Sequence, residues 1–220
     1  ISGSVGPPKT AGLLGLGEGV YPRVSLPESE GRWIVAGERE TIDNDGNRSF
    51  AGMILKVDPA DRRADELALR DGFSSGGFKG GILDRAQMVF AGSWGQNEGR
   101  LRALSTRPGA AGWEEARRSW EGVRAIAGRG DDLVLAGRRF TPVKAAFTEG
   151  TPFLESVDSD TRAFRWRWDG PPDSGGWDAV VALPDGTWLA AGANYEPGSG
   201  HARAWLACVD DAGTLQWQDI

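Results

Sequence analysis

The sequence predicts an all-β fold, a β-propeller with four four-stranded blade repeats. Three observations support this: a segment that recurs four times, companion segments that recur around it, and hydrophobic patterns too short for amphipathic helices. The composition agrees, because 33 of the 220 residues are glycine and 10 are tryptophan. Such usage is typical of many short strands joined by tight turns.

The recurring segment is a hydrophobic run that ends in Ala-Gly. Its four copies end at Gly37, Gly92, Gly137 and Gly192. Their spacing of about 45 to 55 residues falls in the range of propeller blades. Ala-Gly fits a crowded place where two backbones approach closely and no large side chain is accommodated.

Each Ala-Gly strand has one strand before it and two after it. Short turns join the first strand to the second and the third to the fourth, whereas the loop between the second and third strands is longer. The repeats are expected at about residues 20–70, 71–120, 121–169 and 170–220, and residues 1–19 form a linker or the remnant of an upstream element. Neighbouring repeats bury each other's faces, either in a closed four-bladed ring or as part of a larger propeller.

The last repeat shows the full pattern, through Asp185-Gly186, Ala191-Gly192, Trp205, Asp210, Gly213 and Trp217. The first and third repeats keep the aspartate, as Asp58 and Asp158. The chain in this respect resembles bacterial β-propeller repeat proteins with the pattern DG-x-hydrophobic-x-x-AG … D-x-x-G-x-x-x-W. The resemblance covers about residues 20–220 and implies a fold rather than a function. Because such repeats often occur in exported bacterial proteins, it also implies an extracytoplasmic location, whether secreted, periplasmic or at the cell surface.

Charge and composition exclude several classes of function. A net charge of −6 argues against a nucleic-acid binder, and no apolar run reaches the roughly 18 residues that span a membrane. One histidine, His201, and one cysteine, Cys208, are too few for a zinc site. The apolar neighbours of Cys208 predict a buried thiol. Four tryptophans at repeat-matched strand positions are expected in the core, namely Trp33, Trp188, Trp205 and Trp217.

Asp173-Ser174-Gly175-Gly176 is similar to the nucleophile loop of trypsin-like serine proteases. That chemistry needs a serine, a base and an orienting acid. Pro172 stands where the protease loop has a glycine, and the only histidine follows the serine instead of preceding it. We therefore interpret the segment as a link between the third and fourth repeats, with no catalytic residue.

One loop resembles the start of an oxygen-rich calcium site. Asp43, Asp45 and Asn47 occupy alternate positions, as calcium ligands often do. The glycine comes fourth rather than sixth, and Ile54 stands where an EF-hand loop has a bidentate glutamate. The loop is either a calcium site or an ordinary turn, and calcium is the one cofactor that the sequence suggests.

The difference in loop length predicts where a ligand binds. Long loops and links between repeats would emerge at the same end of the blades, and binding residues concentrate on long loops carried by a rigid scaffold. Exposed aromatic rings beside amides and guanidinium groups suit a protein or glycan ligand. The candidate binding residues are Trp94, Asn97, Arg138, Phe140, Trp177, Asn194, Tyr195, His201 and Arg203.

We therefore expect a non-catalytic binding module that presents its long-loop face to a protein or glycan. One alternative is a propeller-type carbohydrate-active hydrolase with paired carboxylates; Glu38, Glu40 and Asp178 are candidates to face its tunnel or rim. The other is a structural half-propeller, either a homo-oligomer or a chain that associates with another chain to complete the ring.

Overall fold

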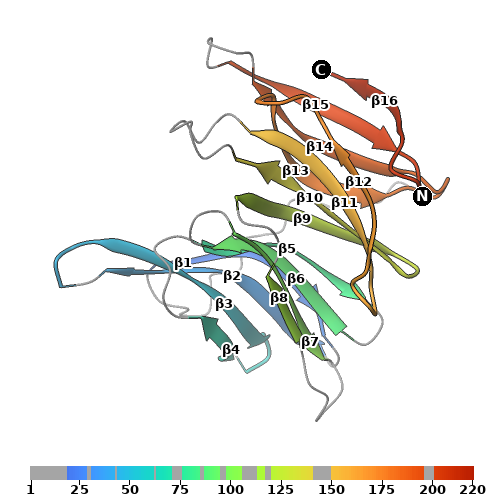
Figure 1. Cartoon of the computed structure of the whole chain (residues 1–220). Coiled ribbons are helices and arrows are strands. Elements are labelled where there is room, and N and C mark those ends of the chain that lie inside the picture. The colour runs from blue at the N-terminus through green and yellow to red at the C-terminus, as the bar shows by residue number, and fades with distance from the viewer. Residues whose placement is uncertain are drawn as a thin grey trace, which may run out of the picture.

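The computed structural model describes residues 19–28, 31–42, 44–61, 63–70, 76–84, 87–94, 98–105, 113–116, 120–140, 150–195 and 201–220. In these residues the regular structure consists of four antiparallel sheets, each made of four strands in chain order. The prediction of an all-β propeller with four four-stranded repeats is confirmed (Figure 1).

Each sheet lies within one of the four repeats. The first contains β1 (Val20–Pro27), β2 (Trp33–Ile42), β3 (Arg48–Asp58) and β4 (Arg63–Arg70). The second contains β5 (Gly76–Asp84), β6 (Gln87–Trp94), β7 (Glu98–Ser105) and β8 (Trp113–Ala116). The third contains β9 (Glu121–Arg129), β10 (Asp132–Arg139), β11 (Thr151–Asp158) and β12 (Phe164–Asp169). The fourth contains β13 (Gly175–Ala182), β14 (Trp188–Tyr195), β15 (Ala202–Val209) and β16 (Leu215–Asp219).

Successive sheets stack face to face and bury apolar side chains of their second strands. In the first three sheets, two alternate residues of this strand face the following sheet: Ile34 and Ala36, Val89 and Ala91, and Val134 and Ala136. The residues between them face the other way, so these strands are continuously apolar rather than alternating. No apolar cluster of described residues joins the first sheet to the fourth. The described part of the chain is therefore an arc of four stacked sheets (Figure 1).

Tryptophans fill the interface between the third and fourth sheets. The ring centroids of Trp177 and Trp205 are 4.5 Å apart, and Trp168 lies 5.9 Å from Trp177. Trp177 is 0% exposed, so the prediction that it is exposed for ligand binding is wrong. Its ring lies in the core because β13 begins two residues before it, at Gly175.

The predicted core tryptophans divide into two pairs. Trp188 and Trp205 are buried as expected, but Trp33 is 41% and Trp217 47% exposed. Both exposed rings belong to the two end sheets of the arc, which have a neighbouring sheet on one side only. The prediction of core positions is therefore wrong for Trp33 and Trp217, whereas the predicted burial of Cys208 is confirmed.

The Ala-Gly pairs mark a close backbone approach, as predicted. A Cβ atom added to Gly37, Gly92, Gly137 or Gly192 would lie 2.0 to 2.2 Å from a carbonyl oxygen of the first strand of the same sheet. No side chain fits there without displacing a strand. The glycine of the motif is therefore required by sterics in all four repeats.

The repeated aspartate has a structural role in the turn between the third and fourth strands. Asp58, Asp158 and Asp210 each accept backbone N–H hydrogen bonds of 2.8 to 3.2 Å through Oδ1 from residues two to four positions later. These are Asx-type turns. The N–H of Thr161, followed by the guanidinium of Arg165, holds the pKa of Asp158 well below its ordinary value.

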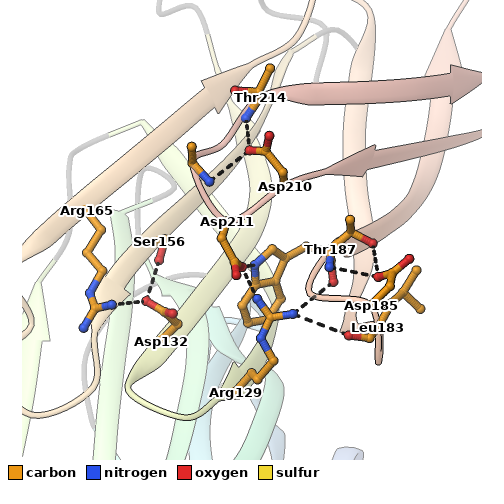
Figure 2. A network of polar contacts seen from close by, with 12 residues as sticks. Arg129, Asp132, Ser156, Arg165, Leu183, Asp185, Thr187, Asp210, Asp211 and Thr214 are labelled. Atoms are coloured by element: carbon orange, nitrogen blue, oxygen red, sulfur yellow. Dashed lines mark hydrogen bonds and ion pairs between the residues drawn. The ribbon is translucent and has the colours of Figure 1, made fainter.

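Figure 2 shows the short-turn end of the third and fourth sheets, where polar contacts hold the two sheets together. Arg129, at the end of β9, forms an ion pair with Asp211 and lies 3.4 Å from the carbonyl oxygens of Leu183 and Thr187. Its guanidinium also lies over the ring of Trp188, 4.5 Å from the centroid. These contacts join turns of adjacent sheets and account for the charges at this end of the interface. A ligand site is better sought at the opposite end.

Candidate functional site

A β-bulge occurs at the same place in all four innermost strands. Successive sheets meet chiefly through β1, β5, β9 and β13, and each of these strands has one register shift opposite the Ala-Gly pair of its neighbour. The extra residues without a cross-strand partner are Arg23, Lys79, Arg124 and Asp178. All four are charged. The bulge thus places one ionic side chain per sheet on the inner side of the arc.

Two carboxylates pair with these side chains across the sheet interfaces. Glu38, which follows the first Ala-Gly pair, is almost fully buried and pairs with both Arg23, at 3.2 Å, and Lys79. It therefore connects the bulges of the first and second sheets. Arg124 pairs directly with Asp178 and connects those of the third and fourth.

The bulges of the second and third sheets lie next to each other, and both carry a positively charged side chain. Gly80 follows Lys79, and Ala125 follows Arg124. A Cβ atom added to Gly80 would lie 3.0 Å from the Cα of Ala125, so these two backbones are in direct contact. Two cations consequently extend from adjoining strands at the middle of the arc.

Arg138 adds a fourth cation at this end of the sheets. Its stem packs on Gly176, because a Cβ added there would lie 3.0 to 3.3 Å from three carbons of the arginine. Its guanidinium lies over the ring of Phe140, 4.7 Å from the centroid. Burial, and then the charge of Arg124, lowers the pKa of Arg138 to about 10. The side chain is still cationic at neutral pH.

Six of the described residues make up this group, which we call the axial cluster: Arg23, Glu38, Lys79, Arg124, Arg138 and Asp178. Within the axial cluster, four cations accompany two carboxylates. The Nε of Arg138 is buried and has no hydrogen-bond partner among the described residues. In a chain of net charge −6, this local positive excess attracts an anion, and a guanidinium is well suited to hold a carboxylate.

Several predicted binding residues lie beside the axial cluster. Arg138 belongs to it, Phe140 stacks on Arg138, and Tyr195 is near enough to Arg138 to raise the pKa of its guanidinium. Asn194 precedes Tyr195 at the end of β14 and lies opposite Arg203 of β15. Tyr195 is further tied to the link before β13 by its N–H, which donates to the Ser174 carbonyl at 2.9 Å.

The other residues that were predicted to bind a ligand or calcium are His201, Trp94, Asn97, Asp43, Asp45 and Asn47. His201 is exposed and comes just before β15. Trp94 ends β6, but its side chain lies outside the described residues, as does the whole of Asn97. The predicted calcium ligands Asp45 and Asn47 are exposed in a turn, while Asp43 lies outside the described residues. Calcium binding there stays a prediction.

In the described ranges, no three His, Cys, Asp or Glu side chains are grouped so that they could hold a metal ion. Nor does that part of the chain contain a helix long and apolar enough to cross a membrane. The hydroxyl of Ser174 donates to the Pro171 carbonyl at 2.6 Å, which is a turn contact.

Sequence reasoning named Glu38 and Asp178 only as hydrolase candidates and missed Arg23, Lys79 and Arg124. A signal for them exists in the repeat. The bulged residue comes 13 or 14 positions before the glycine of each Ala-Gly pair, and in every repeat that position is charged. A charged residue inside an otherwise apolar inner strand is the expected sign of a bulge that points a side chain away from the sheet.

The stacked sheets and their central bulges define the class of the protein, a β-propeller. No family model matches the chain, and no curated protein is significantly similar to it. Solved structures are similar in fold. They include hydrazine synthase from Kuenenia stuttgartiensis (13% identity, TM-score 0.59), with 87% of this chain and 51% of that chain covered.

Two further neighbours are YjhT and a quinohemoprotein alcohol dehydrogenase from Comamonas testosteroni. YjhT is 10% identical with a TM-score of 0.52, over 89% of this chain and 68% of that chain. The dehydrogenase is 14% identical with a TM-score of 0.51, over 84% and 33%. This chain thus spans about half of the synthase chain and a third of the dehydrogenase chain. Their names differ in chemistry, so the shared fold does not decide the function.

Proposed function

We propose that this protein is a non-catalytic binding module that holds an acidic segment of a partner protein at the axial cluster. The observation that carries the proposal is the surplus of cations there. Arg138 forms no ion pair with another described residue, and its buried Nε lacks a hydrogen-bond partner among them. A carboxylate bound at this position would satisfy that donor and offset the neighbouring charge of Arg124.

Two of the predicted aromatic residues are poorly placed to stack on a glycan, which favours a protein ligand. A sugar ring would need an exposed aromatic face on which to stack. Trp177 is buried in the core, and the guanidinium of Arg138 covers one face of Phe140. Aspartate and glutamate side chains of a peptide need only the cations, which the axial cluster supplies.

The pairing of the carboxylates disfavours hydrolysis. A glycosidase of the usual kind needs two carboxyl groups that are free to contact the scissile bond from opposite sides. Glu38 pairs with Arg23 and Lys79, and Asp178 pairs with Arg124. Both carboxylates are thus engaged by cations of the chain itself. Glu40, the third candidate, is engaged by Tyr21 at 2.9 Å and by Arg48 at 3.1 Å.

A direct test uses a fluorescein-labelled hexaglutamate peptide and measures its anisotropy at low salt. We expect binding that weakens as sodium chloride is added, because the attraction is ionic. Arg138→Met should lower the affinity at least tenfold. Arg165→Met, which removes the same charge from the outer strand β12, is the matched control and should change it less than twofold. Equal losses in the two variants, or equal binding of hexaglutamine, would contradict the proposal.

A second variant separates binding from hydrolysis. Asp178→Asn removes the carboxylate that competes for Arg124, so hexaglutamate should bind severalfold more tightly. If Asp178 were instead a hydrolytic carboxylate, the same change would abolish cleavage of a glycan and give no gain in peptide affinity. Weaker hexaglutamate binding in Asp178→Asn would argue against the axial cluster as an anion site.

A further inference from the structure

The loop between β2 and β3 contains the one acceptor sequence for N-linked glycosylation in this chain. Such a sequence is asparagine, any residue except proline, and then serine or threonine, and residues 47–49, Asn-Arg-Ser, fit it. The other asparagines, Asn44, Asn97 and Asn194, are followed two positions later by glycine, glycine and glutamate. Asp45 adds a further match, because some oligosaccharyltransferases also need an acidic residue two positions before the asparagine. The sequence thus distinguishes one asparagine from the rest.

Asn47 lies on the surface, immediately before the start of β3. Every residue from 44 to 48 is exposed. No heavy atom of the described residues lies within 4 Å of the position that a Cβ atom on Gly46 would occupy. A transferase has to take the acceptor asparagine and its neighbours into its own active site, so an acceptor in a folded protein must lie on an accessible loop. This loop meets that condition.

The hairpin carries the loop beyond the outer strands of its sheet. β1 pairs with β2 only as far as Arg39, and β4 pairs with β3 only as far as Gly52. β2 and β3 continue to pair with each other as far as Ile42 and Arg48. The end of the hairpin is therefore a two-stranded ribbon, and Figure 1 shows it extending outward from the first sheet. An enzyme can approach such a ribbon without displacing a neighbouring strand of the described sheet.

Two contacts across the ribbon order the acceptor sequence and leave it at the surface. The hydroxyl oxygens of Thr41 and Ser49 are 2.5 Å apart, in an exposed pair. Arg48, whose side chain is 69% exposed, pairs with Glu40 at 3.1 Å. The hydroxyl of Ser49, which the acceptor sequence requires, is therefore reached by exchanging one hydrogen bond at the surface, and no buried residue has to move.

We propose that Asn47 is the acceptor of an N-linked oligosaccharide, which an oligosaccharyltransferase transfers from a polyprenyl diphosphate carrier. The amide Nδ2 of Asn47 forms a bond to C1 of the first sugar. The bond between C1 and the diphosphate oxygen breaks, its electron pair leaves with the diphosphate, and the amide nitrogen loses one proton to a base. Oligosaccharyltransferases act outside the cytoplasm, so the proposal requires the extracytoplasmic location that the repeat pattern implies.

This modification is independent of the axial cluster. Glu38 is the member of that cluster in β2, and Ile42, where the ribbon ends, comes four residues later, about 13 Å along an extended strand. Asn47 lies beyond that point. Asn47→Gln should therefore leave hexaglutamate binding unchanged, so the acceptor site and the proposed peptide site are tested separately.

Transfer of a glycan to the purified, folded chain tests the proposal. The reagents are a lipid-linked oligosaccharide and an oligosaccharyltransferase that requires the acidic residue, and intact-mass spectrometry is the readout. We expect the 23.5 kDa chain to gain one glycan, which peptide fragmentation places on Asn47. Asn47→Gln should gain none, although it keeps the other three asparagines. A glycan on another asparagine, or the same gain in Asn47→Gln, would overturn the proposal.

Two pairs of variants test the acceptor sequence itself. Ser49→Ala removes the hydroxyl and should lower the yield at least tenfold, whereas Ser49→Thr keeps the hydroxyl and should be modified as well as the unchanged chain. Asp45→Asn should lower the yield at least tenfold, whereas Asp45→Glu should not. Equal yields within either pair would contradict the assignment.

A synthetic peptide of residues 40–52 shows whether the fold presents the acceptor. The peptide contains the same acceptor sequence without the surrounding sheet, so it sets the rate for an unobstructed asparagine. Because residues 44 to 48 are exposed, the folded chain should be modified at a rate within tenfold of that of the peptide. Modification of the peptide without modification of the folded chain would show that the fold hides Asn47, and would overturn the proposal.

Discussion

Replacing Gly137 with alanine would place a Cβ atom 2.0 Å from the carbonyl oxygen of Gly122 and 3.1 Å from the Cα of Val123. Cβ atoms essentially never approach another heavy atom more closely than 3.0 Å. The two strands must therefore separate by about 1 Å at this point, which is the bulge that carries Arg124.

The cost follows from this displacement. Overpacking a tightly packed site costs about 1–3 kcal/mol, and each ladder hydrogen bond that the movement breaks costs about 1 kcal/mol more. We expect Gly137→Ala to lower the free energy of unfolding by about 3 kcal/mol. For a chain of this length that corresponds to a fall in Tm of about 6 to 12 °C.

Urea unfolding followed by tryptophan fluorescence measures the effect, and hexaglutamate anisotropy reports the position of Arg124. Gly46→Ala is the control, because no heavy atom lies within 4 Å of its Cβ position and only its φ of +82° makes alanine unfavourable. That conformation costs about 1 to 2 kcal/mol and should leave peptide binding unchanged. If Gly137→Ala were no less stable than Gly46→Ala and bound the peptide normally, the steric reasoning would be refuted.

Two further predictions concern the third sheet. Arg167, 8% exposed, pairs with the buried Glu155 at 2.9 Å. Arg167→Met should lower the free energy of unfolding by about 3–5 kcal/mol, because it leaves a buried carboxylate without this partner. Arg165→Met, two residues away and more exposed, is the control and should lower it far less in the same urea titration. Asp158 has a lowered folded-state pKa, so its contribution is present above the unfolded pKa near 4 and is lost as the pH falls below it. Asp158→Asn should therefore make the free energy of unfolding less sensitive to acid between about pH 4 and pH 2, and an unchanged acid slope would contradict this.

The repeats made the fold predictable because sterics and burial act locally on them. The glycine of each Ala-Gly pair is required because a carbonyl oxygen occupies the space of a Cβ atom. Each repeated aspartate is required because its side chain closes a turn. These constraints lie within one sheet. They therefore recur with the repeat and can be read from the sequence without knowledge of the neighbouring sheets.

Burial between sheets was harder to predict, because equivalent positions meet different surroundings. Trp33 and Trp188 both come four residues before an Ala-Gly glycine, yet only Trp188 has a sheet against it. The error at Trp177 has another cause. Gly175 and Gly176 resemble a flexible link, but they begin β13, where Gly176 packs on the stem of Arg138 and Gly175 adopts a φ of +132°.

The residues of the proposed binding site were half predictable for a related reason. Arg138, Phe140 and Tyr195 lie near the long loops and were named as candidates by that route. Arg23, Lys79 and Arg124 lie within strands, where a single charged residue in an apolar run does not by itself indicate a site. The recurrence of a charge at this position becomes visible only when the four repeats are aligned on their glycines.

The bulges also separate the charged side chains of the proposed binding site from the residues that set the fold. A bulged residue belongs to no cross-strand pair, so exchanging its side chain leaves the register of its sheet unchanged. Positions 23, 79, 124 and 178 can therefore change one at a time during evolution, while the glycines opposite them stay constant. The same freedom is useful to a protein engineer, who could reverse the charge of the axial cluster, or make it apolar, sheet by sheet on one scaffold.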